Sequence, residues 1–114
     1  AAVQEAAVTA LGADQSCVES SRAIFKARRD HVAAALDRMG FAYRMPEGAF
    51  YFWVRVPGAR TSAAFCMEML EKAGVVVTPG TGFGPHGEGY FRISLTCADA
   101  RIDEALARMQ KQIC

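Results

Sequence analysis

The sequence predicts an α+β fold: a small, mostly antiparallel sheet of about four strands with helices packed on one face, one of them long. Two patterns carry this prediction. Apolar residues recur at helical spacing in residues 16–39 and 96–113. Aromatic and β-branched residues dominate residues 49–56 and 90–95. The elements follow in the order helix, helix, strand, strand, helix, strand, strand, helix, which is typical of a layered α+β domain.

Two helices are predicted in the first third of the chain. Residues 1–11 are rich in alanine and favour a helix that Gly12 ends. A long helix follows from Ser16 to about Met39. Ser16 and Glu19 have the pattern of a capping box, in which each side chain binds the other residue's backbone N–H. The apolar stripe of the long helix comprises Val18, Phe25, Val32, Leu36 and Met39.

Two more helices complete the helical layer. Thr61 or Ser62 caps a helix that runs to about Lys72, and Gly74 ends it. Its inward side chains are predicted to be Phe65, Met69 and Leu70. The last helix begins with a second segment that resembles a capping box, residues 96–99. Its apolar face comprises Ile102, Ala105, Leu106, Met109 and Ile113.

Four segments are predicted as strands. They are residues 41–44, 49–56, 75–78 and 90–95. Pro46 and Gly48 indicate a turn between the first two segments, and a glycine-rich loop at residues 79–89 joins the last two. Tyr51 and Trp53, on the second strand, are interpreted as packing residues.

The composition narrows the classes of function. The 13 Lys and Arg residues nearly balance the 12 Asp and Glu residues without any basic run, so we expect no nucleic-acid partner. No apolar run reaches membrane-spanning length, so we expect no membrane partner, and residues 1–11 lack the pattern of a signal peptide. The four cysteines have no metal-binding spacing, which predicts free thiols in a reducing cytoplasm and no metal site.

The glycine-rich loop contains the pattern G-x-G-x-x-G at Gly82, Gly84 and Gly87. In a dinucleotide site this pattern opens a helix whose N-terminus holds the pyrophosphate. Here it leads into a strand, and Pro85 removes one backbone donor, so phosphate binding is the weaker interpretation. The favoured interpretation is a tight connection that needs positive φ at several positions.

A single cation, Arg92, lies in the middle of the last predicted strand. Strand alternation places it on the face opposite Phe91, Ile93 and Leu95. An arginine at such a position is usually solvated or paired with a carboxylate, and Glu88 is a candidate partner. Its guanidinium group also suits bidentate capture of a substrate carboxylate. The residues alone leave these alternatives open.

Three longer motifs together span nearly the whole chain. They are QEAAVTALGADQSCVESSRAIFKARRDHVAAAL at residues 4–36, PEGAFYFWVRVPG at 46–58 and AGVVVTPGTGFGPHGEGYFRISLT at 73–96. In this order they resemble the C-terminal part of class I/II pyridoxal-phosphate-dependent aminotransferases, the enzymes of the aspartate aminotransferase type. The segment GEGYFRISLT is most similar to the LL-diaminopimelate aminotransferase subgroup.

The resemblance implies roles for a few residues. In this family the arginine of the strand after the glycine loop binds the α-carboxylate of the substrate, and Arg92 occupies that position. Phe83 would line the cleft, and Gly48, Ala49 and Phe50 match the strand entrance near the substrate side chain. The implied substrates are a 2-oxo acid and an amino acid, either LL-diaminopimelate or one of the aspartate, alanine or glutamate type. The implied cofactor is pyridoxal 5'-phosphate.

The chain departs from the family in what it lacks. The family's catalytic lysine and cofactor-binding residues precede every motif that matches, and Lys26, Lys72 and Lys111 are predicted to be surface residues. The resemblance thus implies that residues 1–114 are a C-terminal small domain, with 1–15 the trailing end of the large domain. We expect the chain alone to be inactive, with no catalytic or cofactor-binding residue of its own. Its parent would be a cytoplasmic homodimer, with lysine biosynthesis as its implied pathway.

Two other functions fit the same residues. A free-standing binding module would use Arg92 to hold carboxylates or a partner, with weak carboxylate affinity and no cofactor. A domain with an exposed apolar interdomain face would instead associate with itself. Self-association that depends on concentration would separate this second function from the first.

Overall fold

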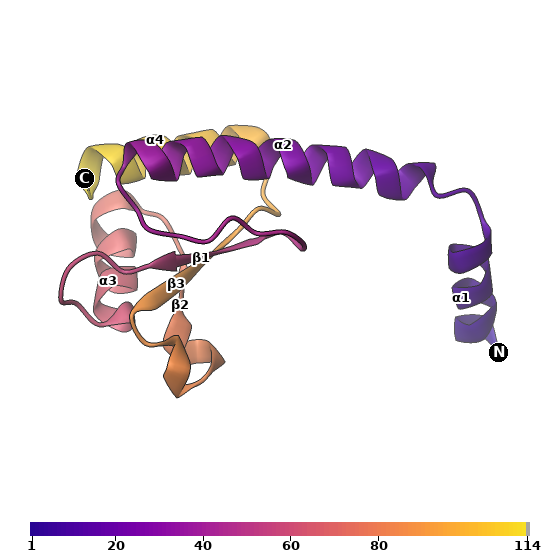
Figure 1. Cartoon of the computed structure of the whole chain (residues 1–114), viewed down its shortest axis with the longest axis horizontal. Helices are drawn as coiled ribbons and strands as arrows, with labels where there is room; N and C mark the ends of the chain where they lie inside the picture. Colours follow the sequence, from indigo (N-terminus) through magenta and orange to yellow (C-terminus); the bar gives the residue numbers. More distant parts are fainter. Residues whose placement is uncertain (114) are drawn as a thin grey trace.

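The computed structural model describes residues 1–113, which form an elongated molecule with principal extents of 51 × 30 × 23 Å. The helices are α1 (Ala2–Gly12), α2 (Ser16–Arg38), α3 (Ser62–Glu68) and α4 (Asp99–Gln112), and α3 continues as the π-helical segment η1 (Met69–Ala73). Figure 1 shows α2 and α4 side by side along one side of the sheet, α3 beside them, and α1 apart at the far end. The predicted order of the helices is confirmed.

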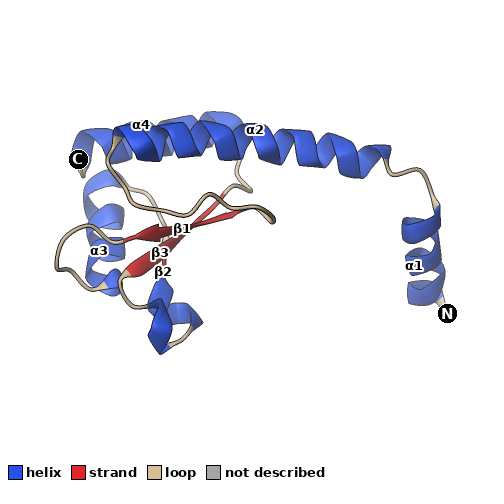
Figure 2. Ribbon diagram, in the orientation of Figure 1, coloured by secondary structure: helices blue, strands red, loops and turns tan. Residues whose placement is uncertain are grey.

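The sheet has three strands, β1 (Tyr51–Arg55), β2 (Thr78–Pro79) and β3 (Tyr90–Ser94), in the order β1-β3-β2 (Figure 2). Both pairings are antiparallel, and Arg92 in the central strand lies opposite Trp53 on one side and Thr78 on the other. The predicted α+β class with an antiparallel sheet is therefore confirmed, with one strand fewer than expected.

The predicted strand at residues 41–44 forms only an isolated bridge, between Tyr43 and Val54. The Arg55 N–H also donates to the Ala42 carbonyl at 2.8 Å, so this segment runs beside β1 for a short distance. Pro46, which has no N–H to donate, lies two residues after Arg44, and the ladder does not extend. The predicted strand at 75–78 is also shorter, because pairing begins only at Thr78. Val76 remains 82% exposed, so pairing there would bury little apolar surface.

The first predicted capping box, between Ser16 and Glu19, does not form. The Asp14 carboxylate instead accepts hydrogen bonds from the Ser16 hydroxyl and, at 3.3 Å, from the Ser16 N–H, and these bonds lower the pKa of Asp14. Glu19 accepts a hydrogen bond from Arg22 at 2.7 Å. Asp14 thus accepts from the Ser16 N–H in place of Glu19, and the Glu19 N–H donates to the Gln15 carbonyl at 3.2 Å instead of to the Ser16 hydroxyl.

The second predicted box also fails, whereas the predicted cap at Thr61 is confirmed. No side chain caps α4; its first residue, Asp99, accepts from Arg28 Nε at 2.6 Å, and the Thr96 hydroxyl lies 2.9 Å from that of Ser94. Thr61 Oγ1 accepts from the Ala64 N–H at 3.2 Å. A long-range ion pair thus replaces a local cap at the start of α4.

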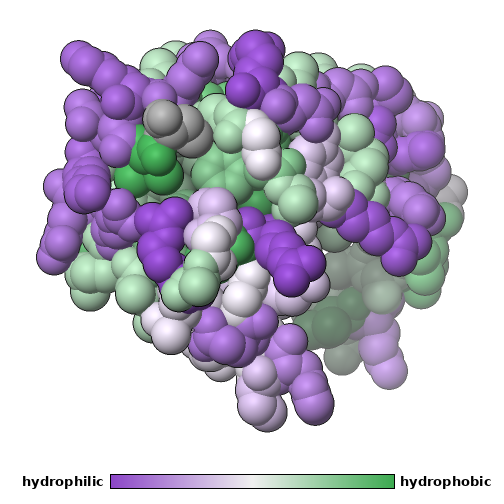
Figure 3. Space-filling view, turned by 60° about the vertical axis from the view of Figure 1, so that its left-hand side comes forward, coloured by the Kyte–Doolittle hydropathy of each residue, from purple (hydrophilic) through white to green (hydrophobic). Residues whose placement is uncertain are grey.

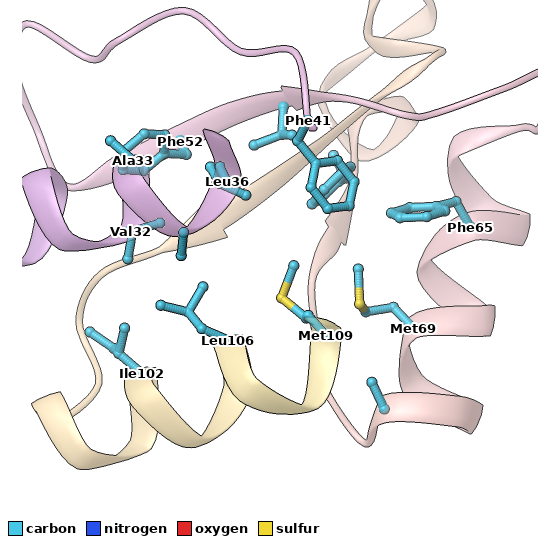
Figure 4. Packing of buried hydrophobic residues seen from close by; sticks show 14 of the residues in the cluster. Val32, Ala33, Leu36, Phe41, Phe52, Phe65, Met69, Ile102, Leu106 and Met109 are labelled. Atoms are coloured by element: carbon cyan, nitrogen blue, oxygen red, sulfur yellow. The ribbon is translucent and has the colours of Figure 1, made fainter. Parts of the chain in front are cut away.

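The core lies between the helices and one face of the sheet (Figure 4). Val32 and Leu36 of α2 and Phe52 of β1 are at most 1% exposed, and the α4 side chains Ile102, Leu106 and Met109 close the core from the other side. The prediction that Leu70 faces inward is wrong, because Leu70 is 46% exposed. The inward face of α3 and η1 is instead formed by Phe65, Met69 and Ala73, which follow one another at spacings of four.

The first 24 residues make no contribution to this core. All of them are exposed, including Val3, Val8 and Leu11 of α1 at 73–86% and Val18 of α2 at 45%. Only the second half of α2, from Phe25 onwards, packs on the body of the molecule. Figure 3 brings the opposite end forward, around α3 and the C-terminus, where hydrophilic side chains surround small apolar patches.

Candidate functional site

The candidate site lies on the face of the sheet that the helices leave open. Along β1, Phe52 and Val54 are buried under the helices, whereas Tyr51 and Trp53 point the other way. Along β3 the same alternation buries Phe91 and places Arg92 on the open face. The predicted face of Arg92 is therefore confirmed.

Two aromatic rings contact the Arg92 guanidinium group. The Arg92 Cζ atom lies 4.3 Å from the ring centroid of Tyr51 and 4.6 Å from that of Phe83. Both distances are within the range of cation–π attraction. Phe83 is itself held by Trp53 in an edge contact at 5.7 Å, and Trp53 stacks on Tyr90 at 5.7 Å. The cation is thus positioned by aromatic side chains from β1 and from the glycine-rich loop.

Arg92 has no acidic partner in the part of the chain that the structure describes. The ion pairs formed among residues 1–113 do not include it, and its buried Nε has no hydrogen-bond partner there. A buried polar group without a partner is unusual in a folded protein and calls for an explanation. A carboxylate on the open face would instead meet the outer guanidinium nitrogens, Nη1 and Nη2, in a parallel pair of hydrogen bonds.

The predicted pairing of Glu88 with Arg92 is wrong. Glu88 Oε1 accepts hydrogen bonds from the backbone N–H of Ser62 at 2.7 Å and of Gly89 at 2.8 Å. These bonds, to Ser62 first and then to Gly89, hold the pKa of Glu88 below its ordinary value. The Ser62 N–H is a free donor at the first turn of α3, so a carboxylate is stabilised there. Glu88 therefore ties the glycine-rich loop to α3 and does not pair with Arg92.

The glycine-rich loop folds into two short 3₁₀ turns, η2 (Gly80–Phe83) and η3 (Pro85–Gly87). Gly84 and Gly89 have φ of 117° and 82°, which confirms that positive φ is needed there. Gly80 and Gly87 meet a different demand, because a Cβ built on either would lie 2.0 Å or less from the carbonyl oxygen of the other. Since the loop opens no α-helix, it lacks the element that a dinucleotide fingerprint needs.

The residues predicted at the strand entrance, Gly48, Ala49 and Phe50, line a groove away from Arg92. Gly48 and Phe50, with the first half of α2, line a groove of about 730 Å³ to which Arg92 does not contribute. Phe50 stacks on Phe25 at 5.2 Å and contacts Tyr51 at 4.6 Å, and Ala49 holds a positive φ of 59°. The structure thus brings Phe83 onto Arg92 and leaves Gly48 and Phe50 at the adjoining groove.

The contact of Tyr51 with the cation is not among the sequence predictions, which assign Tyr51 and Trp53 to packing. The alternation of side chains along residues 49–56 could have predicted this contact. Once residues 49–56 pair with 90–95 in an antiparallel sheet, Tyr51, Trp53 and Arg92 must share a face.

Other kinds of site find no support among residues 1–113. No group of three or more His, Cys, Asp or Glu side chains there could hold a metal ion. No helix in the same residues is long and apolar enough to cross a bilayer. Cys17, Cys66 and Cys97 are free thiols, as predicted, and burial raises the pKa of Cys66; Cys114 lies outside the described residues.

Comparison with known proteins identifies the family. The family model for aminotransferase class I and II matches residues 1–109. The chain belongs to this family.

The relatives show how much of such an enzyme the chain represents. It is 50% identical over 108 residues to LL-diaminopimelate aminotransferase of Oleidesulfovibrio alaskensis, covering 95% of the chain and 28% of that protein. It is 51% identical over 109 residues to the enzyme of the same name from Nitratidesulfovibrio vulgaris, with the same coverage. The solved aromatic aminotransferase from Pyrococcus horikoshii is 39% identical, with a TM-score of 0.88 over 96% of this chain and 30% of that one. The chain thus spans 28% of the length of these curated relatives.

The described residues do not fit the family's cofactor, pyridoxal phosphate, which is held by a lysine. Lys26 pairs with Asp30 at 2.8 Å and Lys72 with Glu68 at 2.8 Å, both on exposed helix surfaces. Lys111 is exposed in the last turn of α4, on the helical side of the sheet. No described lysine therefore lies on the open face with Arg92.

Proposed function

We propose that this chain is the C-terminal, substrate-clamping domain of a pyridoxal-phosphate-dependent aminotransferase, and that Arg92 binds the α-carboxylate of the amino acid and the 2-oxo acid. The observation that carries the proposal is that Arg92, on the open face of the sheet, has no ion-pair partner among residues 1–113. Family membership supports the reaction class. The cofactor and its lysine belong, in this proposal, to the rest of the enzyme, and the chain alone is inactive.

The proposed role of Arg92 is binding and orientation. Two guanidinium N–H groups donate in parallel to the two oxygens of the carboxylate, which fixes both the position and the rotation of the substrate. A substrate held in this way presents its Cα–H bond in one direction, and positioning of this kind is a large part of catalysis. Phe83 bounds the space next to the carboxylate, whereas Gly48 and Phe50 lie beside the groove proposed to receive the substrate side chain.

The proposed amino donor is LL-diaminopimelate, which would place the enzyme in lysine biosynthesis. Support comes from relatives of that name at 50% and 51% identity. A solved relative with another name, aromatic aminotransferase, is 39% identical, so the substrate has to be tested directly. Aspartate, alanine and glutamate are the competing donors.

The proposal extends to the rest of the molecule. Residues 1–15 form the trailing end of a large domain, which is supported by the full exposure of α1 and its apolar side chains. The enzyme acts as a homodimer in the cytoplasm; three unpaired cysteines support a reducing compartment.

Spectroscopy on the full-length gene product tests the reaction. The product is mixed with pyridoxal phosphate, and its absorption is recorded before and after LL-diaminopimelate, aspartate, alanine or glutamate is added. A cofactor band that changes with one of these amino acids supports aminotransferase activity and identifies the donor. A product that binds no cofactor would contradict the proposal and favour a free-standing carboxylate-binding module.

Substitution of Arg92 tests the site. We expect Arg92→Gln to raise the apparent dissociation constant for the amino acid at least about tenfold, because a charge-assisted hydrogen-bond pair is lost. The cofactor band should stay unchanged. Arg55→Gln is the matched control, since Arg55 is an exposed arginine of the same sheet outside the aromatic contacts. Equal weakening by both substitutions would assign the effect to general charge and overturn the role of Arg92.

A further inference from the structure

The contacts of Arg92 leave its hydrogen-bonding groups available. A guanidinium group has five N–H donors, which lie in its plane. The contacts with Tyr51 and Phe83 are made through ring faces and occupy none of these donors. An acidic partner would hold the cation equally well but would occupy the donors that a ligand needs. The aromatic rings thus hold the cation without competing with a carboxylate.

We propose that Tyr51 and Phe83 form an aromatic clamp that positions Arg92 for carboxylate binding, with Phe83 as the positioning residue and Trp53 as its support. The inference rests on the proposed carboxylate role of Arg92. It gives Tyr51 and Phe83 a role that acts through the arginine, in addition to the place of Phe83 beside the carboxylate.

The structure explains why Phe83 is available for this role. Phe83 ends η2 and is 53% exposed, so it contributes little to the core. Its position is nevertheless defined, because the loop is fixed at its other end by Glu88 on the Ser62 N–H. Trp53 packs against the Phe83 ring in a T-shaped contact, with the ring centroids 5.7 Å apart. An exposed aromatic ring held from two sides and placed over a cation is a positioned group rather than a core residue.

Preorganisation gives the clamp its effect on binding. An arginine side chain that is free in solution must lose rotamer freedom when it binds a ligand. The clamp restricts Arg92 before the ligand arrives, so less freedom is lost on binding. Removing one ring should therefore weaken carboxylate binding although no contact with the carboxylate is lost.

Acetate is the probe for the test, because it carries a carboxylate and little else. Arg92 Nε–H resonances are followed by NMR in the 114-residue chain as acetate is added. We expect Phe83→Leu, which keeps apolar bulk and removes the ring, to raise the dissociation constant about threefold to tenfold. Phe83→Tyr, which restores a ring, should bind as the unsubstituted chain does. Met67→Leu is the control, because Met67 is exposed to nearly the same degree as Phe83, 54% against 53%, and lies on α3 outside the aromatic contacts.

A second measurement separates positioning from a structural role. Solvent exchange of the Arg92 Nε–H should accelerate in Phe83→Leu, while the melting temperature stays close to that of the unsubstituted chain. Unchanged acetate affinity in Phe83→Leu would overturn the clamp, whether or not exchange accelerates. If no form of the chain binds acetate but exchange still accelerates, the clamp stands and the carboxylate role fails. If acetate binds Phe83→Leu as tightly as the unsubstituted chain, the carboxylate role stands and the clamp fails.

Discussion

The two faces of the sheet are made by the same strands and have opposite properties. On the covered face, Phe52, Val54 and Phe91 are fully buried. On the open face, Trp53 is 37% exposed and Arg92 keeps a buried nitrogen without a partner among the described residues. Successive side chains of a strand point to opposite faces of the sheet. The side chains on the covered face therefore stabilise the fold, and those on the open face form the candidate site. Stability and binding should therefore respond to different substitutions.

The largest expected contrast is between two neighbours on β3. Phe91→Ala should lower the free energy of unfolding by about 3–5 kcal/mol, because it leaves a cavity in the core. Tyr90→Ala, on the open face, should lower it by about 1 kcal/mol, mainly through the lost stack on Trp53. Urea unfolding of the two variants measures both values. Similar losses would show that the faces are not energetically distinct.

A substitution in the loop above the open face should have the next largest effect. Gly87→Ala forces the new Cβ against the Gly80 carbonyl, only 1.9 Å away, so the two backbones must separate. We expect a loss of about 2 kcal/mol, typical of overpacking at a site that cannot relax fully. Gly82→Ala provides the comparison, since its Cβ would meet only the Thr78 methyl group at 3.9 Å. Equal thermal stability of the two variants would contradict the close crossing of the loop.

A smaller gain is expected at the entrance to β1. Ala49 holds φ at 59°, a conformation that is unfavourable for any residue with a Cβ. Ala49→Gly should raise the free energy of unfolding by about 1 kcal/mol, because relief of this strain exceeds the added freedom of the unfolded chain. Ala59→Gly, in a loop without positive φ at that residue, should instead lower it by about 0.5 kcal/mol. A loss in both variants would show that Ala49 is not strained.

The smallest expected effect is on the pH dependence of stability, through the hydrogen bonds by which Glu88 connects the glycine-rich loop to α3. The pKa of Glu88 is lowered in the folded state, so its stabilisation is fully present above the unfolded value of 4.5 and is lost as pH falls through the folded value. Glu88→Gln should therefore be less stable than the unsubstituted chain at neutral pH, and the difference should shrink below pH 4.5.

Melting temperatures measured from about pH 3 to about pH 7 check this prediction, because carboxyl groups titrate in the lower part of this range. Glu71→Gln removes a carboxylate from the exposed side of η1 and is expected to follow the unsubstituted chain at each pH. A constant difference between Glu88→Gln and the unsubstituted chain across the range would refute the role of the ionised carboxylate.

Periodic features of the sequence predicted the fold well. The stripe predicted from Val18 to Met39 located the packed part of α2 from Phe25 onwards, although Val18 itself is 45% exposed. Alternation along residues 90–95 placed Arg92 on the correct face. Both inferences depend on local geometry, which a short segment specifies by itself. Gly74 ended its helix in a left-handed conformation for the same reason, with φ of 64°.

Features that depend on distant partners were predicted less well. Glu88 was one candidate partner for the nearby Arg92, yet it binds Ser62, 26 residues away. The capping boxes predicted at Ser16 and at residues 96–99 do not form. Ser16 binds Asp14 instead, and Asp99 pairs with Arg28. Several acceptors compete for each donor, and the folded geometry decides among them. The aromatic contacts of Arg92 were missed because they require the strand register as well as the strand pattern.

The unpaired state of Arg92 has a consequence for the conditions under which the protein is handled. A guanidinium keeps its charge at any pH at which proteins remain folded, and the described residues provide no acid that would have to be displaced from it. If Arg92 binds a substrate carboxylate, as proposed above, small anions in the solvent compete with that substrate for the same donors. Chloride, sulfate and phosphate buffers should act as weak competitive inhibitors, and screening by added salt should increase the apparent dissociation constant further. The choice of buffer anion thus becomes an experimental variable for this arginine.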